Sequence, residues 1–225
     1  MKKIELILTF GLSLFLPLFL LFSCNSTRNP AELSEAEATI RRNTNPVYVT
    51  NTKKVYLLPV ESIRTPVESY QYFEGDFGSK KFNSNLFLTA DSSEISILIL
   101  NEMGIEMGLL VYDGESASLE STLFPKSLKC EYILLDLQNA YAEEDALKKH
   151  YASYGLEFEE VSQSALSEQN NNASPSAPGG TQNAPLKIRY IKNGKKIIEK
   201  ISIFEKKIVI ENILRGYSYR LTAAE

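Results

Sequence analysis

The stretch LFLTADSSEISILILNEMGIEMGLLVYDG, residues 86–114, decides the fold of this chain. Apolar residues alternate with their neighbours along three segments, and polar stretches at 91–93 and 101–104 separate these segments. Alternation with a period of two is typical of β-strands, whose side chains point to opposite faces in turn. Asp113 followed by Gly114 is a strong hairpin signal. The stretch therefore predicts an antiparallel meander with short loops.

Both faces of the predicted meander carry apolar side chains. One face takes Leu86, Leu88, Ala90, Ile95, Ile97, Ile99, Ile105, Met107, Leu109 and Val111. The opposite face takes Leu98, Leu100, Leu110 and Tyr112. Two interpretations follow: a sheet covered by helices on one side and by another chain segment on the other, or a curved sheet that encloses an apolar cavity. The second interpretation gives five candidate cavity-lining residues: Leu88, Ile97, Met107, Leu109 and Tyr219.

Helical periodicity begins after Pro125. A first predicted helix shows the i, i+3, i+4 apolar pattern over 130–141. A second opens on the acidic residues 143–145 and ends before Gly155. Strands are expected again after it, with a hairpin around Asn193 and Gly194. This order of strands, helices and strands predicts an α+β fold that is mainly antiparallel β.

The N-terminus has the features of an export signal. Lys2 and Lys3 precede an apolar run at 6–22, and the sequence LFSC at 21–24 resembles the bacterial lipobox. A membrane-spanning helix needs about 20 apolar residues, so this run is slightly short for one. We therefore expect a lipoprotein signal and acylation of Cys24; an uncleaved anchor with a chance cysteine is the alternative.

The remaining organisation follows from composition. A signal peptide at 1–23 is expected to precede a flexible tether at 24–45 and a single β-rich domain at 46–223. A segment rich in Asn, Pro and Gly predicts a disordered insertion at about 163–185. Asn25 follows the expected lipid-bearing cysteine, so the Asp-type signal for retention in the inner membrane is absent. The expected location is the periplasmic face of the outer membrane, with acyl chains as the anchor.

Several classes of function are disfavoured by composition. The net charge of −4 argues against nucleic-acid binding, which needs clustered cations. With one histidine, His150, and one cysteine besides Cys24, Cys130, an ordinary His/Cys zinc site is excluded. The sequence contains no P-loop and no G-x-S-x-G motif. We therefore expect no metal and no cofactor, with Cys130 as a small core residue and His150 explained by its place at a helix C-terminus.

Carboxylates are the group that still allows enzymatic chemistry. Asp136 lies within the apolar segment YILLDLQ at 132–138. A buried carboxylate needs partners or a shifted pKa, so Asp136 paired with a second carboxylate remains an alternative of the hydrolase type. Exposure of Asp136 to solvent, or capping of a neighbouring element, is the structural alternative.

Three motifs carry a resemblance to a known family: YDG at 112–114, LLDLQ at 134–138 and IEN with GYSYRLT within 210–222. Together they resemble a bacterial lipoprotein family of unknown function that often accompanies aryl-polyene biosynthesis genes. The order of elements over 54–222 is also similar, more distantly, to that of LolA and LolB. The resemblance implies an incomplete, half-open antiparallel β-barrel closed by two helices, with an apolar cavity for acyl chains.

The resemblance gives no residue a catalytic role. Asp136 and Gln138 match a family motif and have no known role there. The family often has Trp-Pro shortly after this motif, where this chain has Ala142 and Glu143. The sequence thus favours a non-enzymatic, outer-membrane-associated lipoprotein that binds or transfers a lipid or another apolar molecule. The alternatives are a structural or assembly lipoprotein without a small ligand and, with less support, a carboxylate-based envelope hydrolase; no protein partner is identified.

Overall fold

The computed structural model describes four stretches of the chain: 30–78, 80–121, 129–164 and 184–224. The chain divides into two compact units, 1–34 and 35–225, and the fold given below is that of the second unit. The expected signal peptide and Cys24 lie outside the described residues, as does most of the expected insertion.

Within the described residues, one antiparallel sheet has ten strands in the order β7-β6-β5-β4-β3-β12-β11-β10-β9-β8. Their bounds are β3 Val67–Phe77, β4 Lys80–Ala90, β5 Ile95–Leu100, β6 Glu106–Tyr112, β7 Ala117–Ser121, β8 Glu157–Ser162, β9 Lys187–Asn193, β10 Lys196–Ile203, β11 Lys207–Asn212 and β12 Tyr217–Ala223. Strands β7 and β8 form the two edges, so this sheet is not closed. The prediction of a mainly antiparallel β fold is confirmed.

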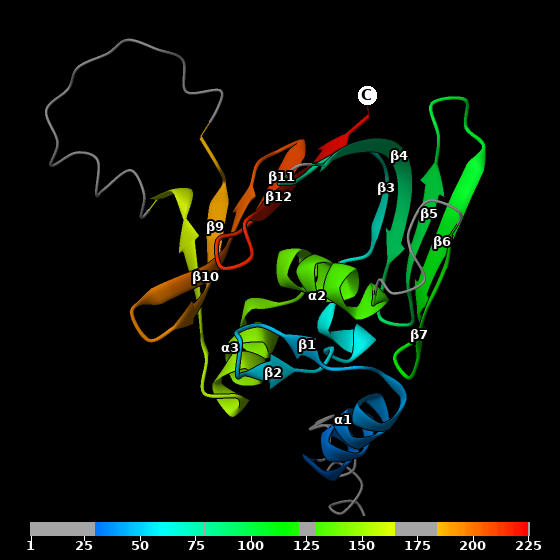
Figure 1. Ribbon diagram of the computed structural model, residues 1–225. Helices are drawn as coiled ribbons and strands as arrows, with labels where there is room; N and C mark the ends of the chain where they lie inside the picture. The colour runs from blue at the N-terminus through cyan, green and yellow to red at the C-terminus, as the bar shows by residue number, and fades with distance from the viewer. Residues whose placement is uncertain (1–29, 79, 122–128, 165–183, 225) are drawn as a thin grey trace, which may run out of the picture. The chain divides into compact units, whose positions relative to one another are not determined.

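Helices α2 and α3 pack against strands of this sheet. The bounds are α1 Pro30–Asn43, α2 Cys130–Tyr141 and α3 Glu144–Ser153, with a short ribbon of β1 Val47–Tyr48 and β2 Lys54–Val55 and a 3-10 turn η1 Val60–Ser62 before β3. Figure 1 shows the strands of the large sheet following an arc around α2. We call the face toward α2 the inner face and the opposite one the outer face. Among the described residues, no helix combines the length and the hydropathy that a membrane crossing requires.

Side chains in the turns fix the meander that the sequence predicts. Asp91 accepts hydrogen bonds at Oδ1 from the backbone N–H groups of Ser93 and Glu94, at 2.7 and 3.1 Å. Asp113 accepts two in the same way from the backbone N–H groups that follow Gly114, at 2.9 and 2.8 Å. Gly114 has a φ of +89°, which glycine adopts without steric cost. These local hydrogen bonds end each strand and start the next one.

The start of the domain differs from the sequence-based expectation of a tether at 24–45. Ile40 is 1% exposed and belongs to the hydrophobic core. Asn45 donates from its backbone N–H and from its side-chain amide to Oε1 of Glu131, at 2.8 Å each. The compact unit therefore includes this segment from 35 onward. The sequence of α1 shows no sustained apolar face, so the pattern does not reveal this packing.

Gln138 has a structural role in this fold. It is 0% exposed, and its side chain accepts a hydrogen bond from the backbone N–H of Leu58 at 2.9 Å and donates to the Leu58 carbonyl at 2.7 Å. The Tyr112 hydroxyl donates to the same carbonyl at 2.9 Å. Leu58 lies in irregular backbone before η1, where no strand or helix satisfies its polar groups. Gln138 thus connects α2 to a segment 80 residues earlier in the chain.

Replacing Gln138 by leucine should lower the free energy of unfolding by about 2–3 kcal/mol, because the buried Leu58 N–H would lose its acceptor. Urea denaturation measures this change. Lys149→Leu, on an exposed position of α3, is the control and should change stability by less than about 0.5 kcal/mol. Equal stabilities of the Gln138→Leu variant and the wild type would contradict the role of this hydrogen-bonded pair.

Candidate apolar binding cavity

A cavity of about 580 Å³ lies between α2 and the inner face of the sheet. Its apolar and aromatic lining residues are Phe73, Phe77, Phe82, Leu86, Ile97, Ile99, Leu110, Tyr132, Ile133, Leu137, Tyr217, Tyr219 and Leu221. Its polar lining residues are Lys80, Ser84, Lys129, Asp136 and Arg215. A mainly apolar cavity of about 300–1,000 Å³ with a few polar groups is typical of small-molecule binding sites.

The five residues that the sequence offers as cavity lining fall into three places. Ile97 and Tyr219 lie in the cavity wall. Leu88 is 1% exposed in the core and is not among the lining residues. Leu109 is half-buried on the outer face of β6, and Met107 is half-buried at the register shift between β5 and β6. Neither is among the lining residues, so the expectation that they line the cavity is corrected.

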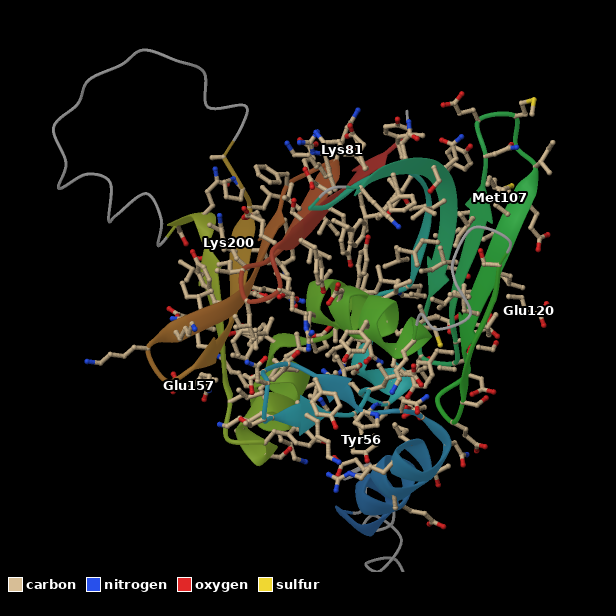
Figure 2. The ribbon with its side chains drawn as sticks, viewed as in Figure 1. Tyr56, Lys81, Met107, Glu120, Glu157 and Lys200 are labelled. Carbon is tan, nitrogen blue, oxygen red and sulfur yellow. The ribbon has the colours of Figure 1, made fainter. Side chains whose placement is uncertain are left out.

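The register of the meander explains the outward direction of Leu109. Cross-strand partners in an antiparallel sheet share a face, and Ile97 pairs with Leu110, which lines the cavity. Leu109 pairs with Glu120 on β7, which is exposed. Figure 2 shows Glu120 on the side of the sheet away from α2. The alternating pattern favours Met107 and Leu109 because they belong to the same apolar set as Ile97. The pairing of Ile97 with Leu110 instead leaves Leu109 on the face opposite to Ile97.

Sequence reasoning missed the contributions of α2 and β3 to the cavity wall. Ile133 and Leu137 are one helical turn apart, so both reach the cavity from the same face of α2. Phe73 and Phe77 are separated by an even number of residues on β3 and therefore point to the same face of the sheet. Both spacings are visible in the sequence. What is not visible is which apolar face packs tightly and which one leaves a space.

Cationic side chains stand at the exposed edge of the cavity. Lys80, Lys129 and Arg215 all line it and are solvent-exposed. The Arg215 guanidinium donates to the backbone carbonyl of Tyr48 and lies over the ring of Tyr132, 5.4 Å from the ring centroid. These two contacts hold the guanidinium in place at the edge.

A buried pair of carboxyl groups reaches the cavity through one of its members, Asp136. Asp136 on α2 and Glu199 on β10 are each 5% exposed and are hydrogen-bonded to each other. Asp136 also accepts hydrogen bonds at Oδ2 from the hydroxyls of Tyr217 and Tyr219, at 3.0 and 3.1 Å. Burial, with the nearby Glu199 charge, holds the pKa of Asp136 well above its usual range, and burial raises the pKa of Glu199 to about 7. The two groups therefore hold a proton between them near neutral pH.

Amide and phenol groups complete this buried network. Asn139 and Asn212 donate from their side-chain amides to the two carboxyl oxygens of Glu199, at 3.1 and 3.3 Å. The Tyr151 hydroxyl donates to Oδ1 of Asn139 at 2.7 Å, and burial holds the pKa of Tyr151 well above its usual range. The network thus joins α2 and α3 to β10, β11 and β12.

Two further titratable groups, His150 and Cys130, lie outside the cavity lining. Burial lowers the pKa of His150 to about 4, so the imidazole is neutral at physiological pH. Burial also raises the pKa of the Cys130 thiol to about 11, so this buried side chain is a poor nucleophile. Within the described residues, no group of three or more His, Cys, Asp or Glu side chains could hold a metal ion.

Asp136→Asn should flatten the dependence of stability on pH. The pKa of Asp136 is raised in the folded state, so its contribution to stability is complete below its unfolded pKa and is lost as the pH rises through the folded value. The asparagine amide can donate permanently to Glu199 in place of the shared proton. We expect the variant to exceed the wild type in stability at about pH 8 by on the order of 1–3 kcal/mol, with the difference shrinking toward about pH 5.

Urea denaturation at several pH values between these limits measures the effect. Asp145→Asn, at an exposed position in the first turn of α3, is the matched control and should follow the wild-type profile. Parallel profiles for Asp136→Asn and the wild type would contradict a shared proton at this pair.

Comparison of the chain with known proteins identifies its family. A crystal structure described as an outer membrane lipoprotein-sorting protein domain from Vibrio parahaemolyticus shares 7% identity with it; the match covers 70% of this chain and 83% of that chain, with a TM-score of 0.30. A TM-score this low carries no argument about fold or function. No curated protein matches the sequence. The family model described as "Protein of unknown function (DUF3261)" matches residues 68–223, more than half of the chain, and the protein therefore belongs to the DUF3261 family.

Proposed function

We propose that this protein binds a lipid or another apolar molecule and passes it on without catalysing a reaction. The observation that carries the proposal is the cavity of about 580 Å³ between α2 and the inner face. Its walls are mostly apolar side chains, so an apolar ligand that enters removes apolar surface from water on both sides. No chemistry on the ligand is needed for such a role.

The proposed setting is the periplasmic face of the outer membrane, with acyl chains on Cys24 as the anchor. More than one chain is needed for persistent attachment, and bacterial lipoproteins normally carry more than one. A LolA/LolB-like architecture, in which α2 and α3 close the open side of the sheet, is part of the same proposal. The membrane and an apolar cargo are the proposed partners.

The cavity favours ligand binding over the two alternatives. A structural or assembly lipoprotein without a small ligand has no use for an open apolar space. For the hydrolase alternative, Glu199 is the second carboxyl group beside Asp136, but the two are hydrogen-bonded to each other. Glycosidases keep their two carboxyl groups about 5–9.5 Å apart, with the scissile bond between them. The contact between Asp136 and Glu199 leaves no such space.

Ser84→Trp tests whether the cavity binds ligand. Ser84 points into the cavity from β4, so an indole there should fill part of the apolar space. We expect the affinity for the neutral apolar fluorophore N-phenylnaphthylamine to fall by at least about tenfold, which corresponds to 1.4 kcal/mol. Fluorescence titration measures the affinity, and thermal unfolding verifies that the variant is folded.

Asn85→Trp is the matched control. Asn85 is the next residue on β4 and is not among the residues that line the cavity. The same side chain placed there should leave the affinity for the fluorophore within about twofold of wild type. Equal affinities of the folded Ser84→Trp variant and the wild type would mean that the fluorophore binds elsewhere, and the structural-lipoprotein alternative would replace the proposal.

Cys24→Ser tests the proposed anchor. Serine offers no thiol for acylation, so the variant should incorporate no labelled fatty acid and should accumulate as unprocessed precursor or as released protein. Metabolic labelling followed by membrane fractionation measures both effects. Cys130→Ser is the control, since burial keeps that thiol from modification, and it should retain the label. Equal labelling of Cys24→Ser and the wild type would exclude the lipoprotein assignment.

A further inference from the structure

The cations at the cavity edge have no acidic partner among the described residues. Lys80, Lys129 and Arg215 take part in none of the ion pairs that join described side chains. The acidic residue in the described cavity lining, Asp136, is buried and engaged with Glu199. In a chain with a net charge of −4, this edge is a local concentration of positive charge beside an apolar space.

Strand β4 carries two consecutive lysines, and only one of them points toward the cavity. Lys80 shares a face with Ser84 and points toward the cavity. Lys81, the next residue, lies on the other face, where it is 4.0 Å from a carboxylate oxygen of Asp76. Figure 2 shows Lys81 on the side of the sheet away from α2. One of two consecutive lysines is therefore paired on the outer face, and the other stands without an ion pair at the cavity edge.

Arg215 adds an ordered cation to the same edge. Its backbone N–H donates to Oδ1 of Asn212 at 2.9 Å, which fixes the turn before β12. The contacts of its guanidinium with Tyr48 and Tyr132 restrict the side chain before any ligand arrives. A guanidinium that is already ordered loses less entropy on binding an anion than a free lysine does.

We propose that the cavity takes an amphiphile with an anionic head group, whose apolar chain lies against the cavity walls while the head lies among Lys80, Lys129 and Arg215. This inference rests on the proposed function and adds the chemical class of the ligand. The opposite orientation is disfavoured, because an anionic head at the buried side would meet the Asp136 carboxyl group. Charge at the edge therefore selects the head group, and the apolar walls accept the chain.

The experiment compares three ligands with the same chain: dodecanoate, dodecanol and dodecylamine. The full-length protein is held in phosphatidylcholine nanodiscs, and each ligand displaces N-phenylnaphthylamine at about pH 8 and low salt, with empty nanodiscs as the blank. Because the three differ in solubility, the measured quantity is the change in each affinity caused by substitution, not the affinities themselves. Comparing this change between ligands that differ only in the head group, as in a double-mutant cycle, isolates the contribution of the head group.

The test variant is Lys80→Ala with Arg215→Ala, and the control is Lys81→Ala with Arg220→Ala. Both double variants remove two positive charges, but the control residues are not among the cavity lining, and Arg220 pairs with Glu74 at 3.1 Å. We expect the test variant to bind dodecanoate about five- to tenfold more weakly than wild type, since each exposed charge contact is modest. Its affinity for dodecanol should change by less than about twofold, and the control should leave all three affinities near wild type.

Two failures can be told apart. If none of the three ligands displaces the fluorophore from the wild type, the proposed function fails. If dodecanol displaces it but dodecanoate is weakened equally by both double variants, or by neither, the anionic-head inference alone is wrong. Lauroyl-lysophosphatidylglycerol, tested beside dodecanoate, separates the two sources of negative charge: the ligand more affected by the test variant identifies a lipid phosphate or a free carboxylate as the head group.

Discussion

Helix α2 is held against the inner face of the sheet by buried polar side chains that all find partners. Gln138 pairs with the backbone of Leu58, and Asp136 pairs with Glu199. A buried polar group without a partner costs about 1–3 kcal/mol, so sliding or rotating α2 would break several such pairs at once. The position of α2 is therefore fixed by hydrogen bonds as well as by apolar contacts. That position decides how far Ile133 reaches into the cavity.

A fixed helix also explains how an apolar space persists in this domain. Protein interiors are close-packed, and an unfilled apolar volume lowers stability because its lining atoms lose contacts. A helix held only by apolar packing would move to reduce that loss. Here such a movement would separate Asp136 from the hydroxyls of Tyr217 and Tyr219. The polar network thus keeps the cavity open, a cost that is expected where function requires the space.

The helices and turns could be predicted from neighbouring residues in the sequence. The residues of the site could be predicted only in part, because their positions depend on pairing between distant segments. The turns at Asp113 and at Asn193, both helices and the antiparallel class follow from neighbouring residues, and the structure has each of them. The resemblance in three short motifs likewise predicts a family of unknown function, which is confirmed at that level. The outward direction of Leu109 and the pairing of Asp136 with Glu199 depend instead on register and on contacts between distant segments. No period in the sequence encodes those contacts.

The hydrogen bonds of Leu58 and Asn45 have a consequence for how the domain is delimited. The family match begins at residue 68, yet both of these residues precede it and bond to α2 within it. The unit recognised by shared sequence is therefore smaller than the unit that can fold with its polar groups satisfied. A relative that resembles this chain only over the matched region must supply equivalent partners for the buried Glu131 and Gln138 from some other part of its chain, or carry different side chains at those two positions.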